Sequence, residues 1–536
     1  MRSRFPMFRL SIPRLISCLV AWEALCAPAF AADAPQDPGM KEMRRQAAGR
    51  PRRILYNNDG NEPMGMEKFS VEEFLSKRTT RLAGTQVGTI LYCTGPGFGL
   101  FMHGTKAGQL FTTRAGRYAN NRVEEFLKAG TDPLKEIVKF GHQNGMEVFW
   151  SMRMNDTHDG AAKEYGPDLF KANRLKTQHP EWLLGSEANP PHHGKWSGIN
   201  YEVPEVRELA FRIIEDVCQN HDVDGIEMDF FRHPTFFKYP GKNQPVTDAQ
   251  RQMMTDLMRR VRAMADAEGK KRGRPILIAM KVPDSVEYCR TIGLDLEQWL
   301  AGDLLDLLVT TSYFRLNEWD YSVALGHKYG VKVYPSLDEP RIEDKEGQKL
   351  RMSANAYRGR AAEVWAAGAD GVYLYNFFKK DSPYEVLKEA GDPALLAKTD
   401  RFFFASSLGR AHVAGGGFPH GSFQKIEILN PADPRKIAPG KSAEARLNLP
   451  VDISANPSPT LQLRLRFATD VPPDAVKVAI NGTALSNPEA DRQWLDFDLP
   501  ASAVRSGQNV VQATLSESQK ESIVWTDLLV HVRTQP

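Results

Sequence analysis

Strand-like and helix-like segments alternate along residues 53–405 of this 536-residue chain. Short apolar runs bounded by Gly, Pro or Asn predict buried strands, and the stretches between them have apolar residues at helical spacing. Eight strands are predicted: Ile54–Asn57, Gly88–Cys93, Glu147–Met152, Gly225–Asp229, Ile276–Lys281, Leu305–Ser312, Val331–Pro335 and Gly371–Tyr375. Strict alternation is typical of parallel strands with crossover helices, so eight such pairs predict an α/β fold, a closed (β/α)₈ TIM barrel.

The segments between the strands fit this architecture. The predicted helices include Pro204–Asn220, Ala249–Ala267, Leu294–Ala301 and Arg358–Ala367. No predicted strand is followed by G-x-G-x-x-G, so the sequence gives no sign of a dinucleotide cofactor. We expect the barrel domain to span residues 53–410 and to work without a cofactor.

The pattern changes after Phe404. A Gly- and Pro-containing stretch, residues 411–422, is expected to be a linker. Residues 423–536 carry short alternating segments split by Pro, Gly and Asn, which predict an all-β sandwich with an accessory role. Its expected strands are Phe423–Leu429, Ser442–Leu449, Leu461–Phe467, Ala475–Ile480, Trp494–Leu499, Val510–Leu515 and Val524–Val532.

The N-terminus has the features of an export signal. Four arginines precede an apolar stretch, and Ala29-Phe30-Ala31 fits a cleavage site, so residues 1–31 are predicted to be removed after Ala31 and the protein to be secreted or periplasmic. No later run is long and apolar enough to span a membrane. Residues 32–52 are expected to be a flexible basic segment.

Charge and cysteine content exclude several functions. The formal net charge of +3 comes entirely from the predicted signal, which holds four Arg and one Glu, so the rest of the chain gives no electrostatic reason to bind nucleic acid. Beyond the signal only Cys93, Cys218 and Cys289 remain, widely spaced, which fits neither a disulfide framework nor a zinc motif. The oligomeric state stays open.

The fourth predicted strand carries the strongest functional signal. It reads Asp224-Gly-Ile-Glu-Met-Asp-Phe-Phe-Arg-His-Pro234. Period-two alternation places Glu227 and Asp229 on one face, about 6.6 Å apart along the strand. Paired acids are costly in an ordinary core, but the C-terminal mouth of a barrel is where catalysis is usually placed. We expect Arg232 to favour the ionised form of Asp229, and the aromatic residues that follow to stack on sugar rings.

The Asp224-Gly-Ile-x-x-Asp-x-x-Arg-x-Pro234 pattern resembles the strand-four motif of the family 10-like glycosyl hydrolases, which are secreted barrel proteins acting on polysaccharide or peptidoglycan glycans. His233 stands where that motif often has Tyr. The resemblance extends loosely over residues 53–405 and implies that Asp229 takes the place of the family's catalytic carboxylate. It leaves the sugar open.

Glycoside hydrolysis needs a second carboxyl group near the first. Asp284 follows the fifth strand, and Asp338 and Glu339 follow the seventh. We rank Glu339 and Asp284 equally as the catalytic partner of Asp229, and we expect Glu227 to orient Asp229 or to bind substrate. Polar residues after the other strands are the expected sugar-binding groups, together with Arg232 and His233: Asn57, Asp59, Arg153, Asn155, His158, Tyr313 and Asn376.

The leading prediction is therefore a secreted glycoside hydrolase that uses two carboxyl groups, with a poly- or oligosaccharide as its partner. One alternative is a non-catalytic carbohydrate-binding protein on a degenerate barrel. The other is a metal-dependent hydrolase with Asp156, His158 and Asp159 as ligands, although their spacing fits no recognised metal motif.

Overall fold

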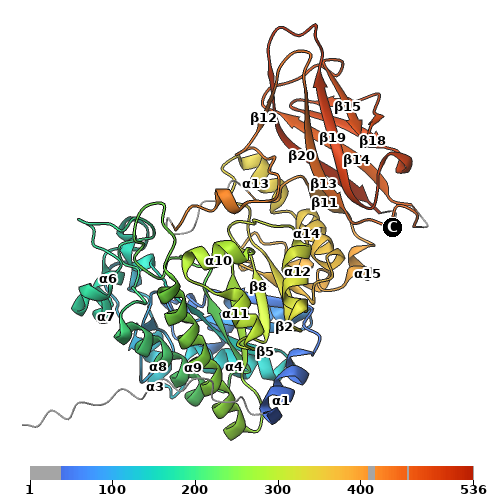
Figure 1. Cartoon of the computed structure of the whole chain (residues 1–536). Helices are drawn as coiled ribbons and strands as arrows, with labels where there is room; N and C mark the ends of the chain where they lie inside the picture. The colour runs from blue at the N-terminus through green and yellow to red at the C-terminus, as the bar shows by residue number, and fades with distance from the viewer. Residues whose placement is uncertain (1–37, 409–416, 456–457, 535–536) are drawn as a thin grey trace, which may run out of the picture. The chain divides into compact units, whose positions relative to one another are not determined.

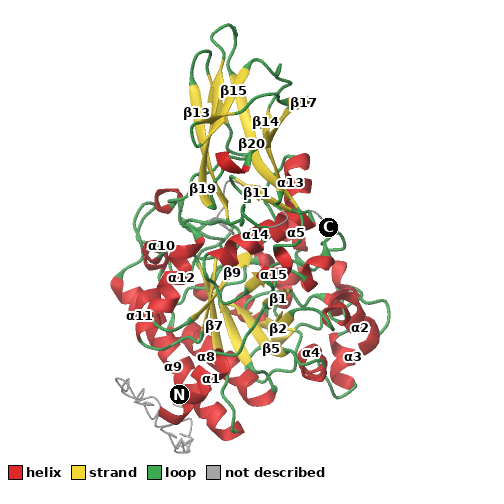
Figure 2. Cartoon of the chain, turned by 90° about the vertical axis from the view of Figure 1, so that its right-hand side faces the viewer, coloured by secondary structure: helices red, strands yellow, loops and turns green. Residues whose placement is uncertain are grey.

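The computed structural model describes residues 38–408, 417–455 and 458–534. The predicted signal peptide and its cleavage site lie outside these residues. Helices lie around the barrel strands in Figure 2, and Figure 1 labels most of the elements. No helix in the described part of the chain is long and apolar enough to cross a membrane.

Eight parallel strands close into a barrel in the order β1-β10-β9-β8-β7-β6-β5-β2. Each of the eight predicted strands corresponds to one of them, so the TIM-barrel prediction is confirmed. Their bounds are β1 Ile54–Asn58, β2 Val87–Cys93, β5 Glu147–Arg153, β6 Gly225–Asp229, β7 Leu277–Val282, β8 Leu307–Thr310, β9 Lys332–Leu337 and β10 Val372–Leu374. Strands β3 (Leu100–Phe101) and β4 (Gln109–Leu110) form a separate small pair.

Helices occupy the connections between the barrel strands. Helix α8 begins with Pro204 in its first turn, which suits the fixed backbone angle of proline, and its apolar positions Val206, Ala210, Ile213 and Val217 are buried. The helices of the barrel are α2 Val71–Arg78, α3 Val123–Lys128, α4 Pro133–Gln143, α5 Ala162–Tyr165, α6 Asp168–Ala172, α7 Arg174–Gln178, α8 Pro204–Asn220, α9 Asp248–Arg272, α10 Val286–Ile292, α11 Leu296–Ala301, α12 Trp319–Lys328, α13 Lys345–Arg351, α14 Ala354–Ala366 and α15 Pro393–Leu396.

The N-terminal segment differs from the prediction. Residues expected to be flexible form helix α1 (Pro38–Ala48), which buries Arg44. The Arg44 guanidinium lies 2.8 Å from carboxylate oxygens of both Asp303 and Asp306, which precede β8. The sequence predicts a flexible basic segment here. Instead, one of its basic residues, Arg44, pairs with buried carboxylates at the end of the barrel where the strands begin.

The C-terminal region contains two antiparallel sheets, as predicted. One has the order β11-β20-β14-β18-β17, with β12 also paired to β20, and the other has the order β13-β19-β15-β16. The bounds are β11 Arg401–Phe404, β12 Arg435–Ile437, β13 Ser442–Leu449, β14 Thr460–Phe467, β15 Val476–Ile480, β16 Thr483–Ala484, β17 Glu489–Asp491, β18 Trp494–Leu499, β19 Gly507–Leu515 and β20 Ile523–Arg533.

The border between barrel and sandwich differs from the expected one. The first sandwich strand, expected at Phe423–Leu429, is absent from the described sheets, and β11 (Arg401–Phe404) pairs with β20 although it precedes the expected linker. Residues 409–416 of that region lie outside the description, whereas Phe418 and His420 pack on barrel side chains: the Phe418 ring lies 5.4 Å from Tyr239 and the His420 ring 4.5 Å from Phe314.

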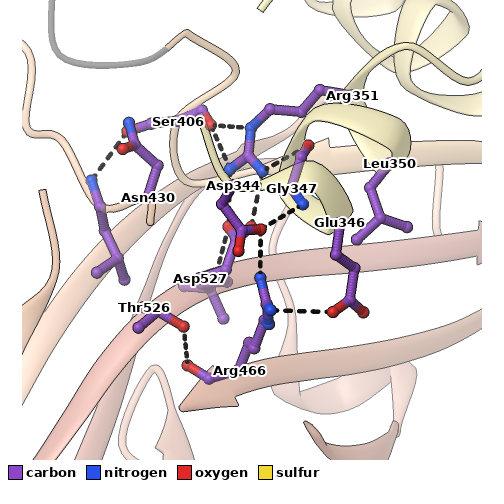
Figure 3. A network of polar contacts seen from close by, with 12 residues as sticks. Asp344, Glu346, Gly347, Leu350, Arg351, Ser406, Asn430, Arg466, Thr526 and Asp527 are labelled. Atoms are coloured by element: carbon purple, nitrogen blue, oxygen red, sulfur yellow. Dashed lines mark hydrogen bonds and ion pairs between the residues drawn. The ribbon is translucent and has the colours of Figure 1, made fainter. Parts of the chain in front are cut away.

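Buried ion pairs join α13 to the sandwich. The Arg351 guanidinium donates to both carboxylate oxygens of Asp527 at 2.7 Å, and neither side chain is exposed. In Figure 3 the same network includes Arg466 of β14, which reaches Asp344 and Glu346. Trp494 is buried as well and donates to Glu346. The sandwich is therefore held to the barrel by specific, desolvated contacts.

Candidate active site

Strand register brings three charged residues to one level of the barrel. Arg153 of β5 lies opposite Asp229 of β6, and Asp229 lies opposite Lys281 of β7. Side chains paired in this way point to the same face of a sheet. One pleat deeper, Ser151 lies opposite Glu227. The predicted placement of Glu227 and Asp229 on one face is consistent with this register.

Asp229 is held rigidly at the end of β6. Its Oδ1 accepts hydrogen bonds from the backbone N–H groups of Phe231 (2.9 Å) and Arg232 (3.0 Å). Its Oδ2 lies 4.0 Å from the Lys281 ammonium. The expected partner was the Arg232 side chain, but that guanidinium turns away to the Tyr375 hydroxyl and His158. The cation beside the carboxylate is Lys281.

Lys281 is fully buried, and its Nζ has no hydrogen-bond acceptor in the described structure. The ammonium lies 3.2 Å from the centroid of the Tyr375 ring and 5.0 Å from that of Tyr373, which is cation–π geometry. Burial lowers the pKa of Lys281, and the charges of Asp229, Glu227 and Asp338 oppose that change. Of the three, Asp229 lies within ion-pair distance of the ammonium, at 4.0 Å.

Glu227 lies below Asp229 and is fully buried. Its Oε2 accepts a hydrogen bond of 2.5 Å from Ser151. Burial and the nearby charge of Asp229 raise the pKa of Glu227 to about 7. Asp229 keeps two backbone donors and a cation, while Glu227 favours its protonated form.

The second carboxyl group at Lys281 is Asp338. It directly follows β9, is 1% exposed, and its Oδ2 has no hydrogen-bond partner in the described structure. The Arg341 Nε lies 3.7 Å from that oxygen. Burial raises the pKa of Asp338 to about 6, against the opposing charges of Arg341 and Lys281. A carboxylic acid of this kind is suited to donate a proton near neutral pH.

The two carboxyl groups predicted as catalytic partners lie in other environments. Asp284 accepts hydrogen bonds from the backbone N–H groups of Leu316 (3.0 Å) and Asn317 (2.9 Å), so it anchors the loop after β8. Burial raises its pKa to about 6. Glu339 forms an ion pair with Lys379 and is partly exposed. The charges that act most on Lys281 are those of Asp229, Glu227 and Asp338 instead.

Several predicted sugar-binding residues form one polar chain beside Asp229. Arg153 contacts Asp59 at 2.5 Å and Asp156 at 3.0 Å. Asp156 lies 2.6 Å from His158 Nδ1, and His158 Nε2 lies 2.5 Å from Arg232 Nη2. Burial and the charge of Arg232 lower the pKa of His158, which favours the neutral imidazole that can accept from Arg232.

The three residues predicted as ligands of an alternative metal site do not form one cluster. Asp159 forms an ion pair with Lys176 at 2.9 Å and leaves the group. The described residues do place ligand atoms of Asp156, His158 and His233 within 4.8 Å of one another. The guanidinium groups of Arg153 and Arg232 contact Asp156 and His158, so both of these residues already have hydrogen-bond partners.

The remaining predicted binding residues differ in availability. Asn155 is committed to the backbone, donating to Ile199 and Thr235 and accepting from Ile199. Asn57 is buried with its Oδ1 unpaired in the described structure. Tyr313 and Tyr375 share a 2.9 Å hydrogen bond between their hydroxyl groups and are almost completely buried. Asp229 is, like these two tyrosines, almost completely buried.

The aromatic residues after β6 were expected to stack on sugars, but Phe230, Phe231, Phe236 and Phe237 are fully buried. Phe230 packs on Phe236 at 5.5 Å between ring centroids and on Trp299 at 5.3 Å. They support the mouth of the barrel from within. The sequence shows that these residues are aromatic, but it does not show to which side of the loop their rings turn.

Backbone strain gathers at the same end of the barrel. Three residues in the loops after β6, β8 and β10 have left-handed backbone angles although none is glycine: His233 (φ 55°), Thr311 (φ 64°) and Asn376 (φ 54°). Such conformations cost about 1–3 kcal/mol each and cluster at functional sites. These strained residues, the unpaired atoms of Lys281 and Asp338, and the raised pKa values of Glu227 and Asp338 occur together at the C-terminal mouth.

The family comparison agrees with the strand-four motif. Residues 103–259 match the family model Glycosyl hydrolase-like 10. The match includes β5 and β6, and with them Arg153, Glu227 and Asp229, and it confirms the resemblance drawn from the motif. The match covers less than a third of the chain and supports a glycosidase-type function for the barrel.

Comparison with solved structures finds matches of low similarity, and no curated protein matches the chain. The PgaB (BpsB) glycoside hydrolase domain from Bordetella bronchiseptica is 10% identical over 64% of this chain and 99% of its own, with a TM-score of 0.40. Alpha-L-fucosidase isoenzyme 2 from Paenibacillus thiaminolyticus is 12% identical over 87% of this chain and 100% of its own, with a TM-score of 0.42. Chitinase ChiA74 from Bacillus thuringiensis is 8% identical over 89% of this chain and 100% of its own, with a TM-score of 0.37.

Proposed function

We propose that this protein is an exported glycoside hydrolase in which Asp229 and Asp338 are the catalytic carboxyl groups. The observation that supports this most is their shared neighbour: both act electrostatically on the buried ammonium of Lys281, from β6 and from the end of β9. Export rests on the signal-like features of residues 1–31.

The two carboxyl groups have different environments and therefore different roles. Asp229 accepts two backbone hydrogen bonds and lies 4.0 Å from the Lys281 ammonium, which fits the position of a nucleophile or a base. Asp338 is buried, lacks a hydrogen bond to Oδ2, and has a raised pKa, as a general acid requires. In the reaction Asp338 donates its proton to the glycosidic oxygen as the bond to the anomeric carbon breaks. Asp229 acts on that carbon, directly in a retaining enzyme or through a water molecule in an inverting one.

The roles can be separated with substrates that differ in leaving group. A general acid is needed for an alkoxide leaving group but not for dinitrophenolate. We therefore expect Asp338→Asn to lose about 10²–10⁴-fold in kcat on a natural glycan and to keep most of its activity on a dinitrophenyl glycoside of the same sugar. Asp229→Asn should lose activity on both.

Asp284→Asn and Glu339→Gln are the matched controls, because each removes one carboxylate from the same end of the barrel. Both should retain glycan hydrolysis in the fraction that folds. If Glu339→Gln or Asp284→Asn shows the leaving-group dependence and Asp338→Asn does not, the assignment of the acid is wrong. Normal turnover by Asp229→Asn would contradict the proposed function itself.

A further inference from the structure

The segment from the end of β9 to the end of α13, residues 338–351, carries the proposed acid at its first residue. Asp338 directly follows β9, and Asp344 caps α13 by accepting a hydrogen bond of 2.6 Å from the Gly347 N–H group. The Asp338 carboxyl group has few hydrogen bonds of its own: Oδ1 accepts from the adjacent Glu339 N–H at 2.8 Å, and Oδ2 has no hydrogen-bond partner in the described structure. Its position therefore depends on the backbone of this segment.

Strands of the sandwich hold α13 at both of its ends (Figure 3). At the first turn, Arg466 of β14 donates to Asp344 at 2.6 Å and lies 3.0 Å from Glu346. At the last turn, Arg351 donates to both carboxylate oxygens of Asp527 in β20 at 2.7 Å. The helix that follows the proposed acid is therefore fixed by two strands of the other domain.

Arg360 of α14 connects the two ends of the same segment. It is buried, and its guanidinium donates to the backbone carbonyl of Asp338 at 2.6 Å and to that of Arg351 at 3.3 Å. Helix α14 in turn lies directly on the sandwich, because a β carbon at Gly359 would clash with the carbonyl oxygen of Phe402 in β11. The contact with the sandwich thus sets the position of Arg360, and with it that of the Asp338 backbone.

We infer that the sandwich is a positioning element of the active site and holds the Asp338 carboxyl group in place for proton donation. The residues that transmit this hold are Arg351, Arg360, Arg466 and Asp527. The inference rests on the proposed function, because it takes Asp338 as the general acid. It gives the sandwich more than the accessory role expected from the sequence. A displacement of about 1 Å in a catalytic group costs about 100-fold in rate, so contacts distant from the substrate affect turnover.

The test uses the full chain and two substrates that differ in their need for an acid. One is the polysaccharide that the unaltered chain cleaves fastest among xylan, dextran, chitin oligosaccharides and glycan strands of peptidoglycan, and the other is the dinitrophenyl glycoside of its sugar. Arg466→Gln and Arg360→Met each remove one connection and keep both proposed catalytic carboxyl groups. We expect kcat on the polysaccharide to fall about 10–100-fold at nearly constant KM, and most activity on the dinitrophenyl glycoside to remain.

Arg464→Gln is the matched control, because Arg464 lies in the same strand as Arg466 and pairs with Asp496 inside the sandwich. It should leave both activities unchanged. Arg360→Lys and Arg466→Lys keep a hydrogen-bond donor at each position and should recover part of the activity on the polysaccharide.

A second measurement does not depend on turnover. Hydrogen exchange of the backbone amides of residues 337–351 reports how firmly the segment is held. Arg466→Gln and Arg360→Met should speed that exchange about 10–100-fold, the usual effect of losing a charge-assisted hydrogen bond, and Arg464→Gln should not change it. Circular dichroism checks that each variant is folded. If Arg360→Met does not fold, Arg466→Gln and Arg360→Lys provide the test.

Unchanged exchange in residues 337–351, or unchanged turnover of the polysaccharide by the folded variants, would overturn the inference. An equal loss on both substrates would overturn it as well, because that pattern indicates general damage and not a displaced acid. The proposed function fails in a different way. If exchange rises but Asp338→Asn keeps full turnover, or no polysaccharide is cleaved, the acid and its positioning are both refuted, while the hold of the sandwich on the segment stands.

Discussion

The two ends of the barrel differ in how their buried charges are paired. At the end where the strands begin, Arg44 and Arg262 contact Asp266 and Asp306 at distances between 2.7 and 3.1 Å, and Arg44 also contacts Asp303. At the mouth, Lys281 and Arg232 have no bonded carboxylate in the described structure, and an oxygen of Asp338 has no partner. The first arrangement stabilises the fold; the second retains unpaired groups that a substrate can satisfy.

This contrast predicts that removing a charge has different effects at the two ends. Arg44→Met should lower the free energy of unfolding by about 3–5 kcal/mol, because it leaves three carboxylates facing a neutral side chain. Denaturant unfolding measures the loss. Lys41→Met is the control, since its pair with Asp303 is partly exposed and should be worth at most about 1 kcal/mol. Equal losses in the free energy of unfolding from both substitutions would show that the buried ion pairs of Arg44 do not stabilise the fold.

The same reasoning extends to the sandwich contact drawn in Figure 3. Arg351→Met leaves the buried carboxylate of Asp527 unpaired and should cost about 3 kcal/mol. Arg464→Met, in a partly exposed pair with Asp496, should cost less than about 1 kcal/mol. Thermal unfolding of the two variants side by side checks the difference. If Arg351→Met unfolds like Arg464→Met, the buried pair adds little and the sandwich is attached by its apolar contacts.

The carboxyl groups at the mouth should also make activity and stability depend on pH. Asp338 must be protonated to act as an acid, so kcat/KM on a natural glycan should fall about tenfold per pH unit above pH 6, where its pKa lies. A raised carboxyl pKa means that the folded state binds more protons than the unfolded one, so the contribution of Asp338 and Glu227 to stability falls as pH rises from about 4 to 7. Activity that stays flat from pH 5 to 8 would contradict the assignment of Asp338.

The smallest expected effect on stability comes from Lys281. Lys281→Met removes an ammonium that lies 4.0 Å from Asp229 and has no hydrogen-bond acceptor in the described structure, so it should lower the free energy of unfolding by about 1 kcal/mol, less than Arg44→Met does. Asp229 keeps its two backbone donors in this variant. Denaturant unfolding measures the difference, and a loss of stability comparable to that of Arg44→Met would refute the contrast between the ends.

Much of the fold could be predicted from the sequence because the signals are local. The eight strands and helix α8 could be predicted from apolar runs and their periodicity. The alternation of side chains along a strand also predicted that Glu227 and Asp229 share one face, which agrees with the register. Helix α1 was not predicted, because its basic residues are typical of a flexible, solvent-exposed segment. The signal for it was Pro38 at its start and the spaced apolar residues Met40 and Ala47, which are buried.

The site was harder to predict because it depends on strand ends. The seventh strand was predicted to stop at Pro335, but β9 continues to Leu337. Alternation from Ser336, which lies opposite Tyr373, places Asp338 rather than Glu339 on the inner face. Lys281 was overlooked although a lone lysine in a strand that is otherwise apolar is a usable signal. The direction of the Arg232 side chain is set by tertiary contacts with Tyr375 and His158, which no local pattern encodes.

The pairing of β11 with β20 has a consequence for how the molecule is made. Strand β11 follows the barrel directly, yet its partner is the last strand of the chain, which also pairs with β14 and β12. On the ribosome the barrel emerges first and must wait for the final residues before β11 finds its partner and Arg351 meets Asp527. A nascent chain stalled before β20 carries an open sheet edge, and chaperones that recognise such edges have their longest opportunity then.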